Sequence, residues 1–108
     1  MKFNVFVIAS ALLASASMAM SATITGFAGA DCTGNKGKSF NVPANECFSY
    51  GADSFKSIKY SGVPNQIKFF ISGGHHDSCT HGANLTRGGG SGCATAPAGV
   101  NWESVSVF

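Results

Sequence analysis

Charged residues are scarce in this 108-residue sequence, which has seven lysines and arginines against five aspartates and glutamates. The basic residues form no stripe of the kind that nucleic acid or an anionic membrane surface requires, so neither is expected as a partner. The acids are dispersed, and no familiar context for a catalytic nucleophile is present. The stretch "TRGGGSG" at 86–92 lacks the Gly-Lys-Ser/Thr ending of a phosphate-binding loop. We therefore expect a protein that is not an enzyme.

Long hydrophobic runs are also missing, apart from one short stretch at the start. A single lysine is followed by an apolar segment from Phe3 to about Leu13 and then by small residues. This order is typical of a secretory signal peptide, and the apolar part is shorter than the roughly 20 residues that span a bilayer. We predict a signal peptide over residues 1–22, cleaved after Ala19 or Ala22, and an extracellular protein without membrane insertion.

The cysteines form no C-x-x-C pair, which disfavours a redox or cysteine zinc site. All four follow the predicted leader, and without Lys2 the remaining chain has six basic and five acidic residues, a net charge of +1. An even cysteine count in a small exported chain predicts two disulfides. A domain of this size buries a modest fraction of its surface, so two links of about 3 kcal/mol each would matter.

Apolar residues at helical spacing are absent as well, and all 14 glycines lie after the leader. Short runs with alternating or apolar residues occur instead, separated by Gly, Asn, Asp and Ser. These runs cover residues 39–42, 55–60, 65–72 and 103–108. Regular short strands between turn residues predict an all-β sandwich or barrel.

An internal repeat is the most informative feature of the sequence. Residues 24–60 can be laid over residues 67–107, with cysteine spacings of 15 and 14 in the two copies. The equivalent pairs are Ile24 and Ile67, Phe27 and Phe70, Cys32 and Cys79, Phe40 and Leu85, Cys47 and Cys93, Phe55 and Trp102, and Ser57 and Ser104. Phe55 and Trp102 are expected in a core shared by the two copies.

The stretch "FAGADCTG" from Phe27 to Gly34 resembles the folded-hairpin signature of the βγ-crystallin Greek key, aromatic-x-x-x-x-aromatic-x-Gly. Cys32 stands in the second aromatic position, and Ser57 and Ser104 match the later serine of that motif. The sequence is most similar to small secreted, disulfide-linked members, namely yeast killer toxins and bacterial antifungal or protease-inhibitor proteins. The resemblance implies a single βγ-crystallin-like domain over 23–108, with two Greek-key motifs at 23–62 and 63–108 packed as a β-sandwich.

The matched positions of the cysteines favour one link within each repeat, Cys32–Cys47 and Cys79–Cys93, while the other two connectivities stay open. By resemblance, the expected function is that of a killer-toxin-like antimicrobial or effector protein, a monomer that binds a target cell surface or wall component. The loops 73–81 and 86–92 are the expected contacts. The alternatives are a secreted protease inhibitor, or a structural or calcium-responsive extracellular protein.

Histidines gather in "GGHHDSCTH", residues 73–81, within a hairpin loop that is longer than its counterpart in the first repeat. His75, His76, Asp77 and His81 are candidate zinc or copper ligands. A polar loop is the alternative, because neighbouring histidines point in opposite directions on an extended backbone and a metal site needs converging ligands. No resident cofactor is expected.

Calcium is a second candidate, because many βγ-crystallin motifs bind it just before the conserved serine. The resemblance assigns Asp53 and Ser57 in the first repeat, and Asn101 and Ser104 in the second. Both runs hold fewer acids than calcium prefers, and the two serines are expected instead to cap turns. Asn84 begins an Asn-Leu-Thr sequon and is a candidate glycosylation site.

Overall fold

Six β-strands and one short 3-10 helix make up the part of the chain that the computed structural model describes, residues 20–72, 79–80 and 82–108. The elements are β1 (Ser21–Phe27), η1 (Ala30–Cys32), β2 (Lys36–Pro43), β3 (Glu46–Ser49), β4 (Ser57–Ile71), β5 (Leu85–Thr95) and β6 (Trp102–Val107). The predicted all-β class is confirmed. Among these described elements, none is a helix with the length and hydrophobicity needed to cross a membrane.

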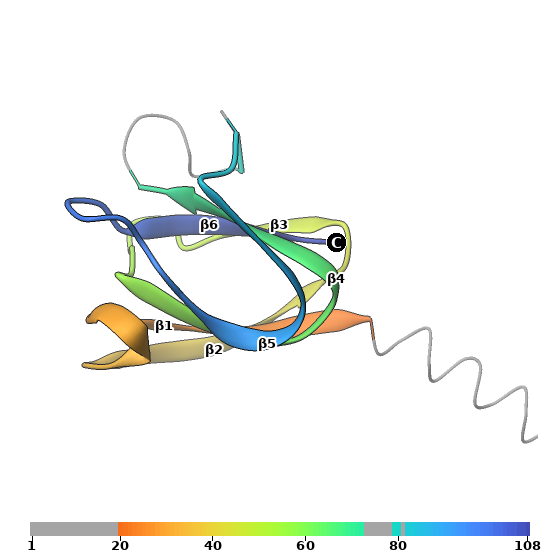
Figure 1. Ribbon diagram of the computed structural model, residues 1–108, viewed down its shortest axis with the longest axis horizontal. Helices are drawn as coiled ribbons and strands as arrows, with labels where there is room; N and C mark the ends of the chain where they lie inside the picture. Colours follow the sequence, from red (N-terminus) through yellow and green to blue (C-terminus); the bar gives the residue numbers. More distant parts are fainter. Residues whose placement is uncertain (1–19, 73–78, 81) are drawn as a thin grey trace, which may run out of the picture.

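The sheet bends into two layers because the long strands β4 and β5 run through both of them (Figure 1). One layer has the order β2–β1–β4–β5, formed by the first part of β4 and the last part of β5. The other layer has the order β5–β4–β6–β3, formed by the opposite parts of the same two strands. The β4–β5 ribbon therefore closes one side of the molecule.

Glycines allow β5 to follow the bend of β4. The pairing of the two strands shifts register between Tyr60 and Gln66. At this corner a Cβ on Gly89 would lie 2.9 Å from the carbonyl oxygens of Val63 and Pro64, so only glycine fits. Gly90 has a φ of 106°, which side chains disfavour. The prediction of a flexible loop at 86–92 is wrong, because these glycines lie within a paired strand.

The opposite side of the molecule is open. β2 and β3 follow one another in the chain but are the outer strands of different layers, and no hydrogen-bonded pairing joins them in the described residues. The connection between them is tight, with Asn45 at a φ of 66°. The two layers therefore face each other across a seam between β2 and β3, where their side chains reach solvent.

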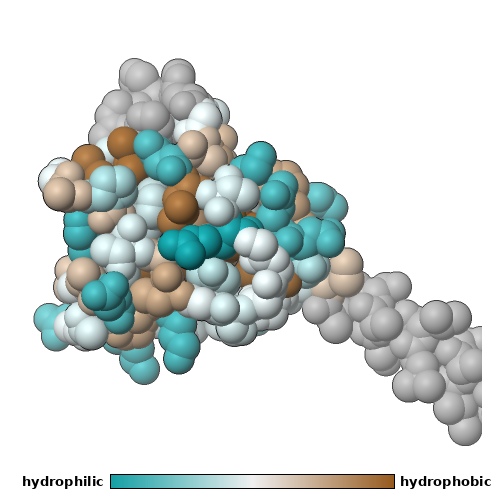
Figure 2. Space-filling model, in the orientation of Figure 1, coloured by the Kyte–Doolittle hydropathy of each residue, from teal (hydrophilic) through white to brown (hydrophobic). Residues whose placement is uncertain are grey.

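The core fills the space between the layers. Its largest fully buried apolar side chains are Trp102, Phe69, Ile24, Ile58, Ile67, Val42, Val105 and Val107. Trp102 donates its indole N–H to the Ala94 carbonyl at 3.0 Å and its ring lies 5.3 Å from that of Phe69. The core position predicted for Trp102 is confirmed. On the face of the molecule seen in Figure 2, hydrophilic and hydrophobic residues are intermixed without one extended apolar area.

The two repeats pair their strands in the same register. The pairs are Phe27–Ser57 and Ile24–Tyr60 in the first layer, and Phe70–Ser104 and Ile67–Val107 in the second. Phe55 and Trp102, which are equivalent in the repeat, exchange backbone hydrogen bonds of 3.0 and 2.7 Å. One alignment is wrong by two residues, because Phe40 lies opposite Ile24 whereas Arg87, and not Leu85, lies opposite Ile67.

Both disulfides connect the two repeats, which corrects the favoured pairing of Cys32–Cys47 and Cys79–Cys93. The observed links are Cys32–Cys93 and Cys47–Cys79, with Cα atoms 6.2 and 6.1 Å apart. The reason is topological. Cys47 of the first repeat lies on β3, which pairs with β6 of the second repeat. Cys93 of the second repeat lies near the end of β5, which pairs with the part of β4 that belongs to the first repeat. Each third strand thus carries its cysteine to the other repeat.

The first strand begins within the predicted leader. Ser21 pairs with Pro43 and the fully buried Ala22 pairs with Val42. The Met20 carbonyl also accepts a hydrogen bond from the Ala44 amide at 3.1 Å. Of the two expected cleavage positions, only the one after Ala19 leaves β1 whole.

Candidate functional site

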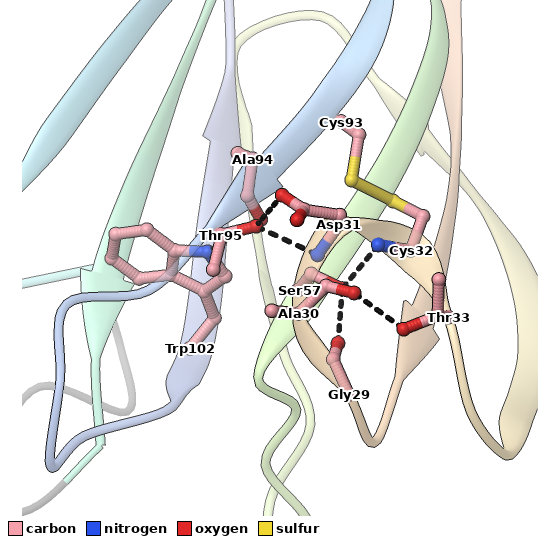
Figure 3. Close-up of a disulfide and its surroundings, with 10 residues drawn as sticks. All are labelled: Gly29, Ala30, Asp31, Cys32, Thr33, Ser57, Cys93, Ala94, Thr95 and Trp102. Atoms are coloured by element: carbon pink, nitrogen blue, oxygen red, sulfur yellow. Dashed lines mark hydrogen bonds between the residues drawn. A yellow bond between two sulfur atoms is a disulfide. The ribbon is translucent and has the colours of Figure 1, made fainter.

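Ser57 and Ser104, the two serines of the repeat motif, bind backbone groups in two hairpins: the first between β1 and β2, and the second between β4 and β5. Ser57 is fully buried, and its hydroxyl accepts the Cys32 amide at 2.8 Å and donates to the Gly29 carbonyl at 2.6 Å (Figure 3). Ser104 is also fully buried and accepts the Cys79 amide at 3.2 Å. Both cysteines have φ near 57°, a left-handed conformation that such bonds stabilise. The turn-capping role expected for these serines is confirmed.

The remaining calcium candidates are Asp53 and Asn101. Asn101 donates its side-chain amide to the Ser54 hydroxyl at 3.2 Å, and Asp53 is exposed. Among the described residues, no three histidine, cysteine or acidic side chains are grouped as a metal site would need. The hydroxyls that each run would offer to calcium are thus already engaged with backbone groups of the hairpins.

The histidine candidates His75, His76, Asp77 and His81 lie outside the described residues. Cys79, in the same stretch, belongs to the disulfide with Cys47. The predicted glycosylation site, Asn84, is exposed, and its side-chain carbonyl accepts the Ile71 amide at 3.3 Å.

Four aromatic side chains line the seam between β2 and β3 and form a continuous row of ring contacts, tilted in the first pair and edge-to-face in the other two. The ring centroids are 4.7 Å apart for Phe40 and Phe48, 5.1 Å for Phe48 and Tyr50, and 4.8 Å for Tyr50 and Phe55. Together they line a cavity of about 420 Å³ that we call the aromatic groove. Its residues are Gly37, Lys38, Phe40, Phe48, Ser49, Tyr50, Asp53 and Phe55.

Strand register explains why these rings point into the seam. Phe40 lies opposite Ile24 and Phe48 lies opposite Val105, and both of these partners are fully buried. Cross-strand partners project from the same face of a sheet, so both phenylalanines project toward the space between the layers. Because their strands are outermost, no further strand covers them, and Phe40 remains 36% exposed.

Phe55 forms the inner end of the groove rather than part of the fully buried core that the sequence predicts. It is half-buried, and its ring lies against the backbone of Gly26 and Gly37. A Cβ on Gly26 would come within 2.3 Å of this ring, and one on Gly37 within 2.9 Å. The two glycines thus make the space in which the Phe55 ring packs.

The Tyr50 hydroxyl is a buried polar group without a hydrogen-bond partner in the described part of the chain. Burial raises the pKa of this hydroxyl, so the group keeps its proton at physiological pH and is a hydrogen-bond donor as well as an acceptor. A buried hydroxyl without a partner is unfavourable by about 1–3 kcal/mol. Lys38, Ser49 and Asp53 add polar groups to the lining.

Sequence reasoning did not find this groove. It placed the contacts in loops 73–81 and 86–92, but the second of these is part of β5 and most of the first lies outside the described residues. The available signal was the alternation of Phe48, in the four-residue strand β3, with Tyr50 directly after that strand, both soon after Phe40 in the chain. That alternation indicates that the two side chains project from the same face of the chain, but it does not show that no further strand covers that face.

Comparison of the chain with protein-family models, with curated proteins and with solved structures finds no match. The groove is therefore interpreted from its own geometry and chemistry.

Proposed function

We propose that the protein is a secreted, βγ-crystallin-like binding protein that acts as a killer-toxin-like antimicrobial or effector on the surface of another cell. Its ligand in this proposal is a wall polysaccharide held in the aromatic groove. Three features support the kinship: two repeats of equal register, a serine that caps each hairpin, and a third strand that each repeat contributes to the other's layer. These are features of a paired Greek-key arrangement.

The observation that carries the binding proposal is the aromatic groove with the polar side chains Lys38, Ser49 and Asp53 in its lining. One face of a pyranose ring presents C–H groups, which carry partial positive charge and stack on the negative face of an aromatic ring. The edge of the sugar presents hydroxyls, which can pair with the polar groups of Lys38, Ser49 or Asp53 in the lining. An apolar wall with a few polar groups is the usual composition of a ligand site.

Rigidity also supports a binding role. The groove lies between two outer strands, and the second disulfide ties the β3 side to the hairpin at Cys79. Phe55 is fixed by its two backbone bonds to Trp102 and by the glycines beneath its ring. A preformed site loses little conformational entropy when a ligand binds, which favours affinity.

A test compares the oxidised wild-type protein with Phe40→Ala in sedimentation with insoluble chitin, β-glucan and cellulose. The Phe40 side chain is partly exposed and is at one end of the row of aromatic rings. Removal of its ring should therefore weaken polysaccharide binding about tenfold while the fold persists. Phe108→Ala is the matched control, because this aromatic ring packs beside Lys68, outside the groove. Wild-type binding to none of the polysaccharides, or equal binding by Phe40→Ala, would contradict the assignment.

Toxicity requires its own assay, because binding does not imply killing. The growth of fungi and bacteria in the presence of wild-type protein and of Phe40→Ala separates the two properties. We expect inhibition of at least one class of cell by the wild type and a higher inhibitory concentration for the variant. Binding without any growth effect would leave a wall-binding protein and reject the antimicrobial role.

Protease inhibition is the alternative function, and one loop favours it. The turn from Pro97 to Gly99 is exposed, and Lys56 stabilises it. The Lys56 ammonium group donates hydrogen bonds to the Pro97 and Val100 carbonyls at 2.7 and 3.3 Å. A rigid, protruding loop is what an inhibitor needs. Incubation with a panel of secreted serine, cysteine and metalloproteases distinguishes this function, with Lys56→Met as the variant that should lose it. No comparable observation favours a calcium-responsive role.

A further inference from the structure

A second cleft lies on the outer face of the sheet, beside the same strand that borders the aromatic groove. It has a volume of about 300 Å³, and β1, β2 and β4 all contribute to it. The residues that line it are Thr23, Thr25, Phe27, Lys36, Ser39, Lys59 and Ser61. Two lysines and four hydroxyl side chains are therefore gathered around one concavity, and no acidic residue lines it.

A β-bulge brings two of these residues to the same face. Ser39 pairs with Thr25 and Lys36 pairs with Phe27, so the register shifts between them. Residues three apart in a regular strand project from opposite faces, but the extra residue here turns both side chains toward the cleft. Lys59 of β4 lies on the other side of Thr25. Ser39, Thr25 and Lys59 thus form a row across three strands.

The charges in this cleft are uncompensated. The ammonium groups of Lys36 and Lys59 have no hydrogen-bond or ion-pair partner in the described residues. By contrast, the Lys56 ammonium group donates to two carbonyls, and the Lys68 ammonium group lies 5.1 Å from the centroid of the Phe108 ring. Two like charges in one concavity repel each other and produce a local positive potential. An anion between them would remove the repulsion.

The hydroxyls supply directional donors for that anion. Thr25 Oγ1 and Ser39 Oγ lie 2.6 Å apart, so one of them donates to the other. The hydroxyl that accepts this bond still has its own O–H, which donates to no other described residue and is free to donate to a ligand. Thr25 is 9% exposed, which fixes its position. Hydroxyl donors and ammonium groups around one point match an ion that only accepts hydrogen bonds.

We propose that this cleft binds a tetrahedral oxyanion, a sulfate or phosphate ester carried on a sugar. Lys36 and Lys59 contact its charged oxygens, and the Thr25–Ser39 hydroxyl pair donates one hydrogen bond. This anion subsite does not depend on the aromatic groove, because the two sites use different side chains and different faces of β2. It adds selectivity for charged glycans to a protein whose net charge is small.

The test is a titration of the oxidised, isotope-labelled protein with sodium sulfate and with sodium phosphate, at constant ionic strength, followed by amide chemical shifts. We expect saturable shifts at Thr25, Ser39 and Lys59 with both salts. Lys36→Gln and Lys59→Gln should each weaken binding about five- to tenfold. Lys38→Gln is the matched control, because it removes the same charge from the same strand but lines the aromatic groove. It should change the affinity less than about twofold.

Glucose 6-sulfate, glucose 6-phosphate and glucose identify the source of the anion. Saturation by either ester at these three residues, with no response to glucose, supports the proposal and shows which ester is preferred. Shifts that do not saturate, or an equal loss in Lys38→Gln, would overturn it by showing only general charge attraction. Phe40→Ala should bind the esters as the wild type does, so failure of the polysaccharide assay and failure of this one are distinguishable.

Discussion

The closed β4–β5 side and the open β2–β3 side of this molecule come from equivalent parts of the repeat, yet they are built differently. On the closed side, the second and third strands of the second repeat merge into the single strand β5. On the open side, their counterparts are the separate strands β2 and β3. Arg87 on β5 takes the register position that Phe40 takes on β2.

The difference shows how a few residues decide between a closed wall and an open groove. The four glycines among residues 88–92 allow β5 to bend around β4, and Gly92 accommodates the Tyr60 ring. The first repeat has Asn41, Val42 and Pro43 at the positions after Phe40, where β5 has three glycines after Arg87. Without that glycine run β2 ends at Pro43 and the separate strand β3 begins at Glu46, and the aromatic rings line the seam between the two strands.

Removal of a disulfide should give the largest loss of stability in this comparison, because one disulfide supports the closed side of the molecule and the other supports the open side. Cys32–Cys93 ties the first hairpin to β5, and Cys47–Cys79 ties the second hairpin to β3. The sequence separations are 61 and 32 residues, and the chain-entropy model gives about 4 kcal/mol for each link. We expect Cys32→Ala/Cys93→Ala and Cys47→Ala/Cys79→Ala to lose similar free energies of unfolding, measured by urea denaturation.

The variant Cys32→Ala/Cys47→Ala is the control for connectivity. The observed pairing leaves Cys79 and Cys93 without their partners, so thiol titration of the native protein should find two free thiols. The matched variants that remove one observed link should show none. A disulfide between Cys79 and Cys93 in the control variant, found by mass spectrometry of its peptides, would reject the crossed arrangement.

Glycine substitutions test the closed side with an intermediate effect. Gly89→Ala places a methyl group 2.9 Å from two β4 carbonyl oxygens and should be destabilising by about 2 kcal/mol. Gly88→Ala is the matched control, because nothing lies within 4 Å of its Cβ and the backbone conformation is unstrained. It should be neutral or slightly stabilising. Equal urea midpoints for the two variants would mean that β5 does not bend tightly at this point.

The hairpin serines test the equivalence of the two repeats with the smallest effect. Ser57→Ala and Ser104→Ala each remove the acceptor of a cysteine amide from a fully buried position, and each should be destabilising by about 1–2 kcal/mol. Serine-to-alanine change at the exposed Ser91 serves as the control. A loss for one hairpin serine and none for the other, in thermal or urea unfolding, would show that the repeats do not share this support.

Local patterns predicted much of the fold but little of the site. Alternation around residues 55–60 and 103–108 correctly indicated strands, and the matched serines correctly indicated turn caps. The glycine run at 86–92 led to the wrong prediction of a loop. Glycine favours turns locally, and it supports a tight strand bend only where another strand lies against it, as β4 does here. The groove was missed for a similar reason: Phe40 and Phe48 look like core residues until their strands prove to be outermost.

What the sequence by itself determined is the all-β class, the presence of two disulfides and the equivalence of two halves, since periodicity, cysteine parity and repeated motifs are written along the chain. Only the tertiary structure decided which cysteines join, that β5 is one strand, and that the aromatic groove and the cleft lined by Lys36 and Lys59 exist. The physical reason is that each of these depends on which strand lies beside which. The exchange of third strands between the halves makes neighbours of residues that no local pattern connects.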